Sequence, residues 1–136
     1  QRRHGEAEPG ARCAPVRHGA LIDKENSVQR INEKDSPFRN GDSGVKYFMR
    51  GPKLDWGVIL LKPGQVMGPH GHRETEETFY CLEGAPTLVV DGRDVPMAAG
   101  EVIRLDPLEK HDLRNDGATT ARIIFIKTPY LPSDRF

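Results

Sequence analysis

The sequence has no excess of charge of either sign, because its 136 residues include 20 Lys and Arg against 20 Asp and Glu. Without a basic excess, a nucleic-acid partner is not expected, since phosphate binding depends on clustered cationic side chains. The sequence also lacks a run of about 18 apolar residues, so a transmembrane helix is not expected either.

Cysteine is scarce as well. Cys13 and Cys81 are too few for a disulfide scaffold. Residues 1–20 lack the apolar stretch that a secretory signal peptide requires. We therefore expect a reduced protein in the cytoplasm.

Glycine and proline are abundant by contrast, with 14 and 11 residues. This composition favours many short strands joined by turns over a helical bundle. The length predicts one domain, residues 27–136, preceded by a polar, irregular arm at residues 1–26. The expected strands are residues 45–50, 54–61, 65–72, 77–82, 87–90, 93–97, 101–105, 111–115 and 120–127.

Two Asp-Gly pairs mark tight turns between expected strands. Asp91-Gly92 is expected to supply the positive φ angles that a short hairpin loop needs, and Asp116-Gly117 indicates a second turn. Many short strands with frequent turns and no helical period are typical of an antiparallel sandwich or barrel. The fold class predicted is therefore all-β.

Three of the five histidines lie in two short segments that are rich in acidic residues. His70 and His72 are one residue apart in an expected strand, so alternation points both imidazoles to the same side. Glu76 and Glu77 follow at once, and His111 follows a later apolar run. Imidazole and carboxylate together bind Fe, Mn, Ni, Zn or Cu. We predict a mononuclear metal site of His70, His72, Glu77 and His111 inside the barrel.

The spacing of these residues resembles the first motif of the single-domain cupins, small metal-binding jelly-roll β-barrels. That motif reads glycine, five residues, H-x-H, three or four residues, glutamate, six residues, glycine. The matching positions here are Gly64, His70, His72, Glu77 and Gly84. With Glu76 in the glutamate position, the closing glycine would be one place off, so Glu77 is the expected ligand.

The second cupin motif is matched in part. Gly100, His111 and Asn115 are in register with its glycine, histidine and asparagine. Pro107 lies one place late, and Leu108 stands where the motif has a glycine. These departures concern the loop before His111, whereas the spacing from Gly100 to His111 is kept.

The resemblance, which covers residues 40–128, implies an antiparallel jelly-roll β-barrel with its metal ligands facing inward. Phe79 and Cys81 would share the inward face of Glu77, and Leu113 and Asn115 that of His111, so these four residues are expected to line the pocket. One divalent transition metal is implied, with Fe, Mn or Ni favoured and Zn or Cu as alternatives. Its open coordination positions would admit a substrate or O2.

The resemblance implies an activity of the kinds found among cupins, which include dioxygenases, decarboxylases and isomerases. We expect a metal-dependent enzyme that acts on a small oxygen-rich molecule, or alternatively a non-catalytic barrel that senses or stores a metal or small ligand. Glu76 is a candidate acid or base at the mouth, although a solvated charge is the simpler interpretation. Sheet edges in a small barrel need cover, and the resemblance implies two paired barrels, so we expect a homodimer. The arm is a candidate for a strand exchanged between the two subunits.

Two further interpretations stay open from the sequence alone. Arg104, in the strand ahead of His111, points either inward as an anion clamp or outward into solvent. Tyr47, Phe48 and Trp56 are interpreted as core or dimer packing rather than as a platform for substrate.

Overall fold

The computed structural model describes residues 21–23 and 28–136. The chain divides into two compact units, residues 1–30 and 31–136. In the first unit, β1 (Leu21–Asp23) pairs antiparallel with β2 (Val28–Arg30). The prediction of an irregular arm is therefore wrong for residues 21–23, which form a strand. The rest of the arm lies outside the described residues. The boundary at residue 26, the exchanged arm strand and the homodimer therefore stay predictions.

The second unit is built from antiparallel strands. Its one helical element among the described residues is a 3₁₀ turn, η1 (Glu33–Asp35). No helix in the described part of the chain has the length and apolar character needed to cross a membrane. The strands are β3 (Gly44–Arg50), β4 (Asp55–Leu61), β5 (Glu76–Glu83), β6 (Thr87–Val90), β7 (Arg93–Pro96), β8 (Val102–Leu105), β9 (His111–Arg114) and β10 (Ala121–Thr128).

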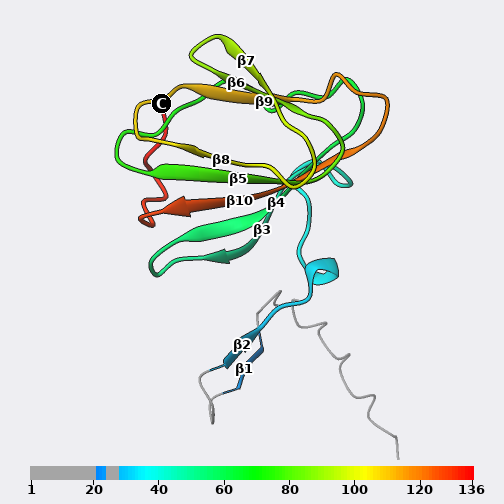
Figure 1. Ribbon diagram of the computed structural model, residues 1–136. Helices are drawn as coiled ribbons and strands as arrows, with labels where there is room; N and C mark the ends of the chain where they lie inside the picture. Colours follow the sequence, from blue (N-terminus) through cyan, green and yellow to red (C-terminus); the bar gives the residue numbers. More distant parts are fainter. Residues whose placement is uncertain (1–20, 24–27) are drawn as a thin grey trace, which may run out of the picture. The chain divides into compact units, whose positions relative to one another are not determined.

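These strands form two sheets that face each other (Figure 1). Five strands form one sheet in the order β3-β4-β10-β5-β8, and three form the other in the order β7-β6-β9. Alternation along each strand turns one apolar face inward, so Ile123, Phe125 and Phe79 of the larger sheet share a core with Leu88 and Leu113 of the smaller one. The predicted all-β antiparallel jelly-roll is confirmed.

The segment of residues 65–72, expected to be a strand, is not a regular one. Only Val66 and His70 form isolated bridges, to Arg114 and His111 respectively. Gly68, with a φ of 97°, breaks the extended backbone between the two bridges. The bridge nevertheless fixes His70 beside His111, because each residue donates its N–H to the carbonyl of the other, at 2.9 and 2.7 Å.

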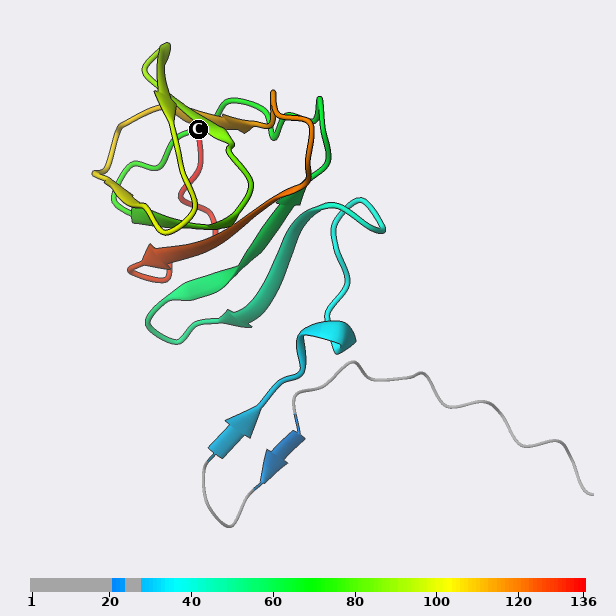
Figure 2. The ribbon, with the colours of Figure 1, turned by 45° about the vertical axis from the view of Figure 1, so that its right-hand side comes forward.

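The segment after β10 is non-regular, as the sequence predicts, and it folds back over the barrel. Figure 2 shows it in red, running from the five-stranded sheet toward the three-stranded sheet. The Tyr130 N–H donates to the Lys53 carbonyl at 2.9 Å. Phe136 and Gly71 exchange two backbone hydrogen bonds of 3.0 Å each. The end of the chain therefore lies against the segment that carries His70 and His72.

Candidate metal centre

The four side chains predicted as metal ligands come together in the structure. His70, His72, Glu77 and His111 each offer a ligand atom, and these atoms all lie within 4.8 Å of one another. Strand β5 supplies Glu77, β9 supplies His111, and the segment before β5 supplies the other two. The side chains of His72, Glu77 and His111 are 7%, 6% and 3% exposed. Three of the four ligand side chains are thus almost fully buried, whereas His70 is half-buried.

A backbone carbonyl orients each imidazole through its Nδ1 atom. The acceptors are the carbonyls of Gly68 for His70 (3.2 Å), Asp134 for His72 and Glu109 for His111 (2.9 Å). A carbonyl oxygen can only accept, so Nδ1 carries a proton, and Nε2 has a free lone pair whenever the ring is neutral. All three rings therefore have a nitrogen that can bind a metal ion.

Two of these nitrogens face one carboxylate oxygen. The Nε2 atoms of His72 and His111 lie 3.1 and 3.0 Å from Oε2 of Glu77. Lone pairs on all three atoms would repel at this distance, so a proton or a cation must lie among them. Three nitrogens and one oxygen suit a divalent transition metal. The residues present therefore fit the ion that the motif implies.

The charge states of the cluster follow from burial and from these contacts. Burial alone would raise the pKa of Glu77, but hydrogen bonds from His111 and His72 outweigh it and lower that pKa to about 2. Burial, followed by the neighbouring His111, lowers the pKa of His70 to about 4. Burial would also lower the pKa of His111, but the hydrogen bond to Glu77 raises it overall. At neutral pH the site therefore holds an ionised carboxylate and a neutral His70, as metal binding requires.

The cluster lines a cavity of about 200 Å³. Phe79 and Leu113, two of the four residues expected in the pocket, line it together with Phe125 and Met67. These side chains give the cavity an apolar wall beside the ligand cluster. Such a wall limits access of water to whatever binds there.

The cavity lining formed by the described residues includes neither Cys81 nor Asn115, so these two pocket predictions are wrong. Cys81 points inward but lies deep in the core, with Sγ 3.6 Å from the Glu83 carbonyl. Asn115 follows the end of β9, and its Nδ2 donates to the carbonyls of Leu61 and Thr119, both at 2.8 Å. Its side chain joins the end of β4 to the turn before β10.

Glu76 and Arg104 lie away from the ligand cluster. Glu76 precedes Glu77 in β5, so its side chain turns to the other face of the sheet, which favours a surface charge over an acid or base. The Arg104 side chain is 61% exposed and lies 3.3 Å from Asp106. Of its two interpretations, the outward one is correct.

Several cavity residues were not found from the sequence. Four of them are cationic, namely Arg39, Arg50, Lys127 and Arg135. Alternation in β10 would have found Lys127, because it lies two residues after the inward-facing Phe125. Tyr47 also lines the cavity, with its ring edge-on to Phe125 at 5.2 Å, so it is a wall residue as well as a packing residue.

Asp134 is a further site residue that no pattern in the sequence indicates. Its carboxylate accepts the backbone N–H groups of Arg73, Glu74 and Thr75, each at 2.8 Å. Desolvation alone would raise the pKa of Asp134, but these donors outweigh it and hold the pKa below its usual value. Its carbonyl accepts from His72 Nδ1. Asp134 therefore ties the end of the chain to one ligand and to the turn after that ligand.

The cupin-domain family Cupin_2 matches residues 57–127, which is more than half of the chain. This chain belongs to the cupin family. An uncharacterized conserved protein with a double-stranded β-helix domain from Klebsiella pneumoniae has a similar structure, with a TM-score of 0.69 and 16% identity over 79% of this cupin and 94% of that chain.

Curated relatives are similar over shorter stretches. The oxalate-binding protein of Thermotoga maritima is 35% identical over 68 residues, which are 50% of this cupin and 56% of that protein. Gentisate 1,2 dioxygenase 1 of Aquipseudomonas alcaligenes is 26% identical over 121 residues, covering 80% of this cupin and 33% of that enzyme. This cupin spans about half the length of the first curated relatives, from 49% to 56%.

Proposed function

We propose that this cupin is a metal-dependent enzyme that acts on a small oxygen-rich molecule, with dioxygenase-type chemistry first and decarboxylation or isomerisation as the alternatives. The observation that carries the proposal is the ligand cluster of three oriented imidazoles and one ionised carboxylate, placed in the wall of a cavity. Bound there, a divalent Fe, Mn or Ni ion would supply Lewis-acid or redox chemistry.

The chain's own residues have separate tasks in this proposal. His70, His72, Glu77 and His111 hold the ion. The backbone carbonyls at their Nδ1 atoms keep the rings in one tautomer and one orientation, which strengthens metal affinity. Phe79 and Phe125 keep water out of the cavity, where charged groups interact more strongly.

The similarity to gentisate 1,2 dioxygenase supports the choice of reaction, because it extends over 80% of this cupin. A second candidate function, metal-assisted binding without turnover, is supported by the similarity to the oxalate-binding protein. Dioxygen consumption separates the two, because an oxygenase consumes O2 with its substrate and a binding protein does not.

Metal content tests the assumption that both candidate functions share, namely that the ligand cluster binds a metal ion. The protein should carry about one transition-metal ion per chain when it is purified from metal-supplemented medium, as measured by plasma mass spectrometry. Glu77→Gln should lose most of that metal, because it removes the anionic ligand. Glu76→Gln, which makes the same change one residue earlier on the other face of β5, should keep it. Equal metal content in the two variants would refute the ligand set.

A further inference from the structure

The cavity is richer in cations than in acids. Four cationic side chains line it, and the acidic residues in its lining are Glu77 and Asp134. Both carboxylates are already engaged, Glu77 by two imidazoles and Asp134 by three backbone N–H groups. A metal ion on Glu77 would add further positive charge. The cavity therefore has a surplus of positive charge that its own acids do not balance.

Two of the four cationic side chains, Arg50 and Lys127, belong to a row of side chains that crosses the five-stranded sheet. In the strand registers, Arg50 lies opposite Asp55, Asp55 opposite Lys127, and Lys127 opposite Glu77. Directly opposite residues share one face, with Cβ atoms about 5 Å apart. We call these four residues the charged row. Its signs alternate from β3 to β5, so each cation has an acid beside it as long as Glu77 is not bound to a metal ion.

Lys127 occupies the critical position in the charged row. Its side chain is only 17% exposed, and its Nζ donates to the Tyr47 hydroxyl at 3.1 Å. Nζ lies 3.8 Å from Asp55 Oδ2, which is beyond normal hydrogen-bond distance. An ammonium group has three donors, so Lys127 keeps donors for a ligand.

Asp55 cannot neutralise both of its cationic neighbours. It is buried between Lys127 and Arg50, whose Nε lies 3.6 Å from Oδ1. Asp55 Oδ1 has no hydrogen-bond partner among the described residues. One carboxylate thus balances two cations, and Lys127 loses its other counter-charge when Glu77 binds a metal ion. An incoming anion would restore the alternation of the charged row.

We propose that this cavity binds the carboxylate of a small organic acid, with Lys127 as the residue that selects for the negative charge. The proposal rests on the proposed function, because it places the substrate in the cavity of the ligand cluster. The size of the cavity limits the acid to a small one: a cavity of about 150 Å³ takes up benzene, and this one measures about 200 Å³. Its aromatic and aliphatic wall suits the apolar body of a one-ring or short-chain acid.

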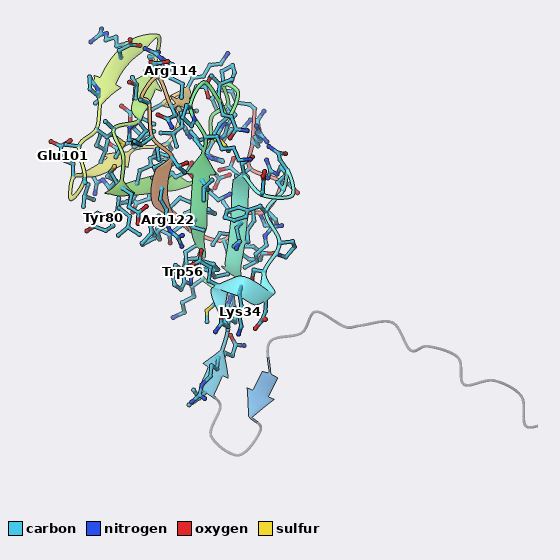
Figure 3. The ribbon with its side chains drawn as sticks, turned by 90° about the vertical axis from the view of Figure 1, so that its right-hand side faces the viewer. Lys34, Trp56, Tyr80, Glu101, Arg114 and Arg122 are labelled. Carbon is cyan, nitrogen blue, oxygen red and sulfur yellow. The ribbon has the colours of Figure 1, made fainter. Side chains whose placement is uncertain are left out.

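Calorimetric titration with benzoate and with benzamide tests the proposal, because the two probes share a shape and differ in charge. The affinity for benzoate should exceed that for benzamide by a factor of about ten or more. Lys127→Met should weaken benzoate binding about tenfold and leave benzamide binding unchanged. Lys34→Met makes the same change on η1, outside the cavity (Figure 3), and should alter neither.

A second variant keeps the test decisive if Lys127→Met fails to fold. Asp55→Asn removes the negative charge that competes with a bound carboxylate, so benzoate should bind several-fold more tightly. A purely structural role for the charged row predicts the opposite, because loss of Asp55 would disorder Lys127 and weaken binding. Lys127→Arg keeps the charge and should retain the preference for benzoate over benzamide.

Any of four results would overturn the proposal. The first two are equal affinity for the two probes and no benzoate binding at millimolar concentration. The other two are unchanged benzoate affinity in Lys127→Met and displacement of benzoate by inorganic phosphate at a concentration lower than benzoate needs for binding. Metal content measured on the same samples separates this proposal from the proposed function. Wild-type protein that prefers benzoate but carries no metal would refute the metal-dependent enzyme. The anion site would then depend on the excess of four cations over two acids in the cavity lining, without the contribution of a metal-bound Glu77.

Discussion

Leu108 has a backbone conformation that favours glycine, and replacing it should stabilise the protein. Its φ is 73°, in the left-handed region that side chains with a Cβ atom rarely adopt. The same position is a glycine in the second cupin motif. The Leu108 side chain is 66% exposed and buries little apolar surface. We therefore expect Leu108→Gly to raise the free energy of unfolding.

The size of the effect is a difference between two larger quantities. A Cβ atom in the left-handed region costs about 1–2 kcal/mol, which glycine avoids. Glycine also lowers the free energy of unfolding by roughly 0.5–1 kcal/mol, because the unfolded chain with glycine has more conformational freedom. The net gain is about 0.5–1 kcal/mol. For a domain of this size, that corresponds to a rise in Tm of roughly 2–5 °C.

Leu108→Ala is the matched control, because it removes the exposed side chain but keeps the Cβ atom. Urea unfolding of the three proteins, analysed as two-state transitions, gives the comparison. Leu108→Gly should be more stable than Leu108→Ala, and Leu108→Ala should be close to wild type. Metal content should not change, because the N–H of residue 108 still donates to the His72 carbonyl. If the glycine variant is no more stable than the alanine variant, the strain argument is wrong.

Three further predictions concern the ligand cluster and the end of the chain. Asp134→Asn should lower Tm at neutral pH, because one oxygen cannot accept all three N–H groups; since the folded-state pKa is lowered, this advantage of the wild type is complete above 3.8 and disappears as the pH falls below it. Gly71→Ala would place a Cβ 2.6 Å from the Phe136 ring, which is 46% exposed and can move aside, so unfolding experiments should show a loss of only about 1 kcal/mol. A chelator should lower Tm in thermal scans, by an amount equivalent to about 4 kcal/mol when the metal had been at a thousandfold excess over its Kd.

Each of these predictions has a control and a result that would contradict it. A Tm difference between wild type and Asp134→Asn that stays undiminished as the pH falls from 3.8 through the lowered folded-state pKa would show that the carboxylate charge is not its source. The cost of Gly71→Ala should disappear in a Phe136→Ala background, and an undiminished cost there would place the clash elsewhere. The chelator should leave Tm of Glu77→Gln unchanged, and an equal drop in that variant would indicate a metal bound at another site.

Strands β3 to β10 and the ligand cluster were predictable from the sequence because they depend on local rules. Alternation with a period of two places Glu77 and Phe79 on one face, and the Asp-Gly pair at residues 91–92 forms the hairpin turn between β6 and β7. The spacing of the first motif then identifies the cluster, since His70 and His72 lie just before the strand that carries the glutamate.

Alternation alone could not determine how far the cavity extends along each strand. Cys81 faces inward like Glu77, but it lies four residues further along β5, or about 13 Å at the rise of a strand. Asn115 lies at the same sequence distance from His111 and beyond the end of β9. Both residues are buried, yet the cavity stops short of them. A pattern of period two predicts the face on which a residue lies but not its depth in the barrel.

The orientation of the ligands shows the same division between local and long-range causes. The acceptors for His70 and His111 are carbonyls two residues earlier, Gly68 and Glu109, so a short segment of chain orients each of these rings. His72 instead depends on the carbonyl of Asp134, 62 residues away. No local pattern reveals that contact, because it requires the complete barrel and the folded-back end of the chain. Loss of the last three residues should therefore disturb His72 more than the other two rings, so the metal affinity of this cupin should depend on a segment outside both cupin motifs.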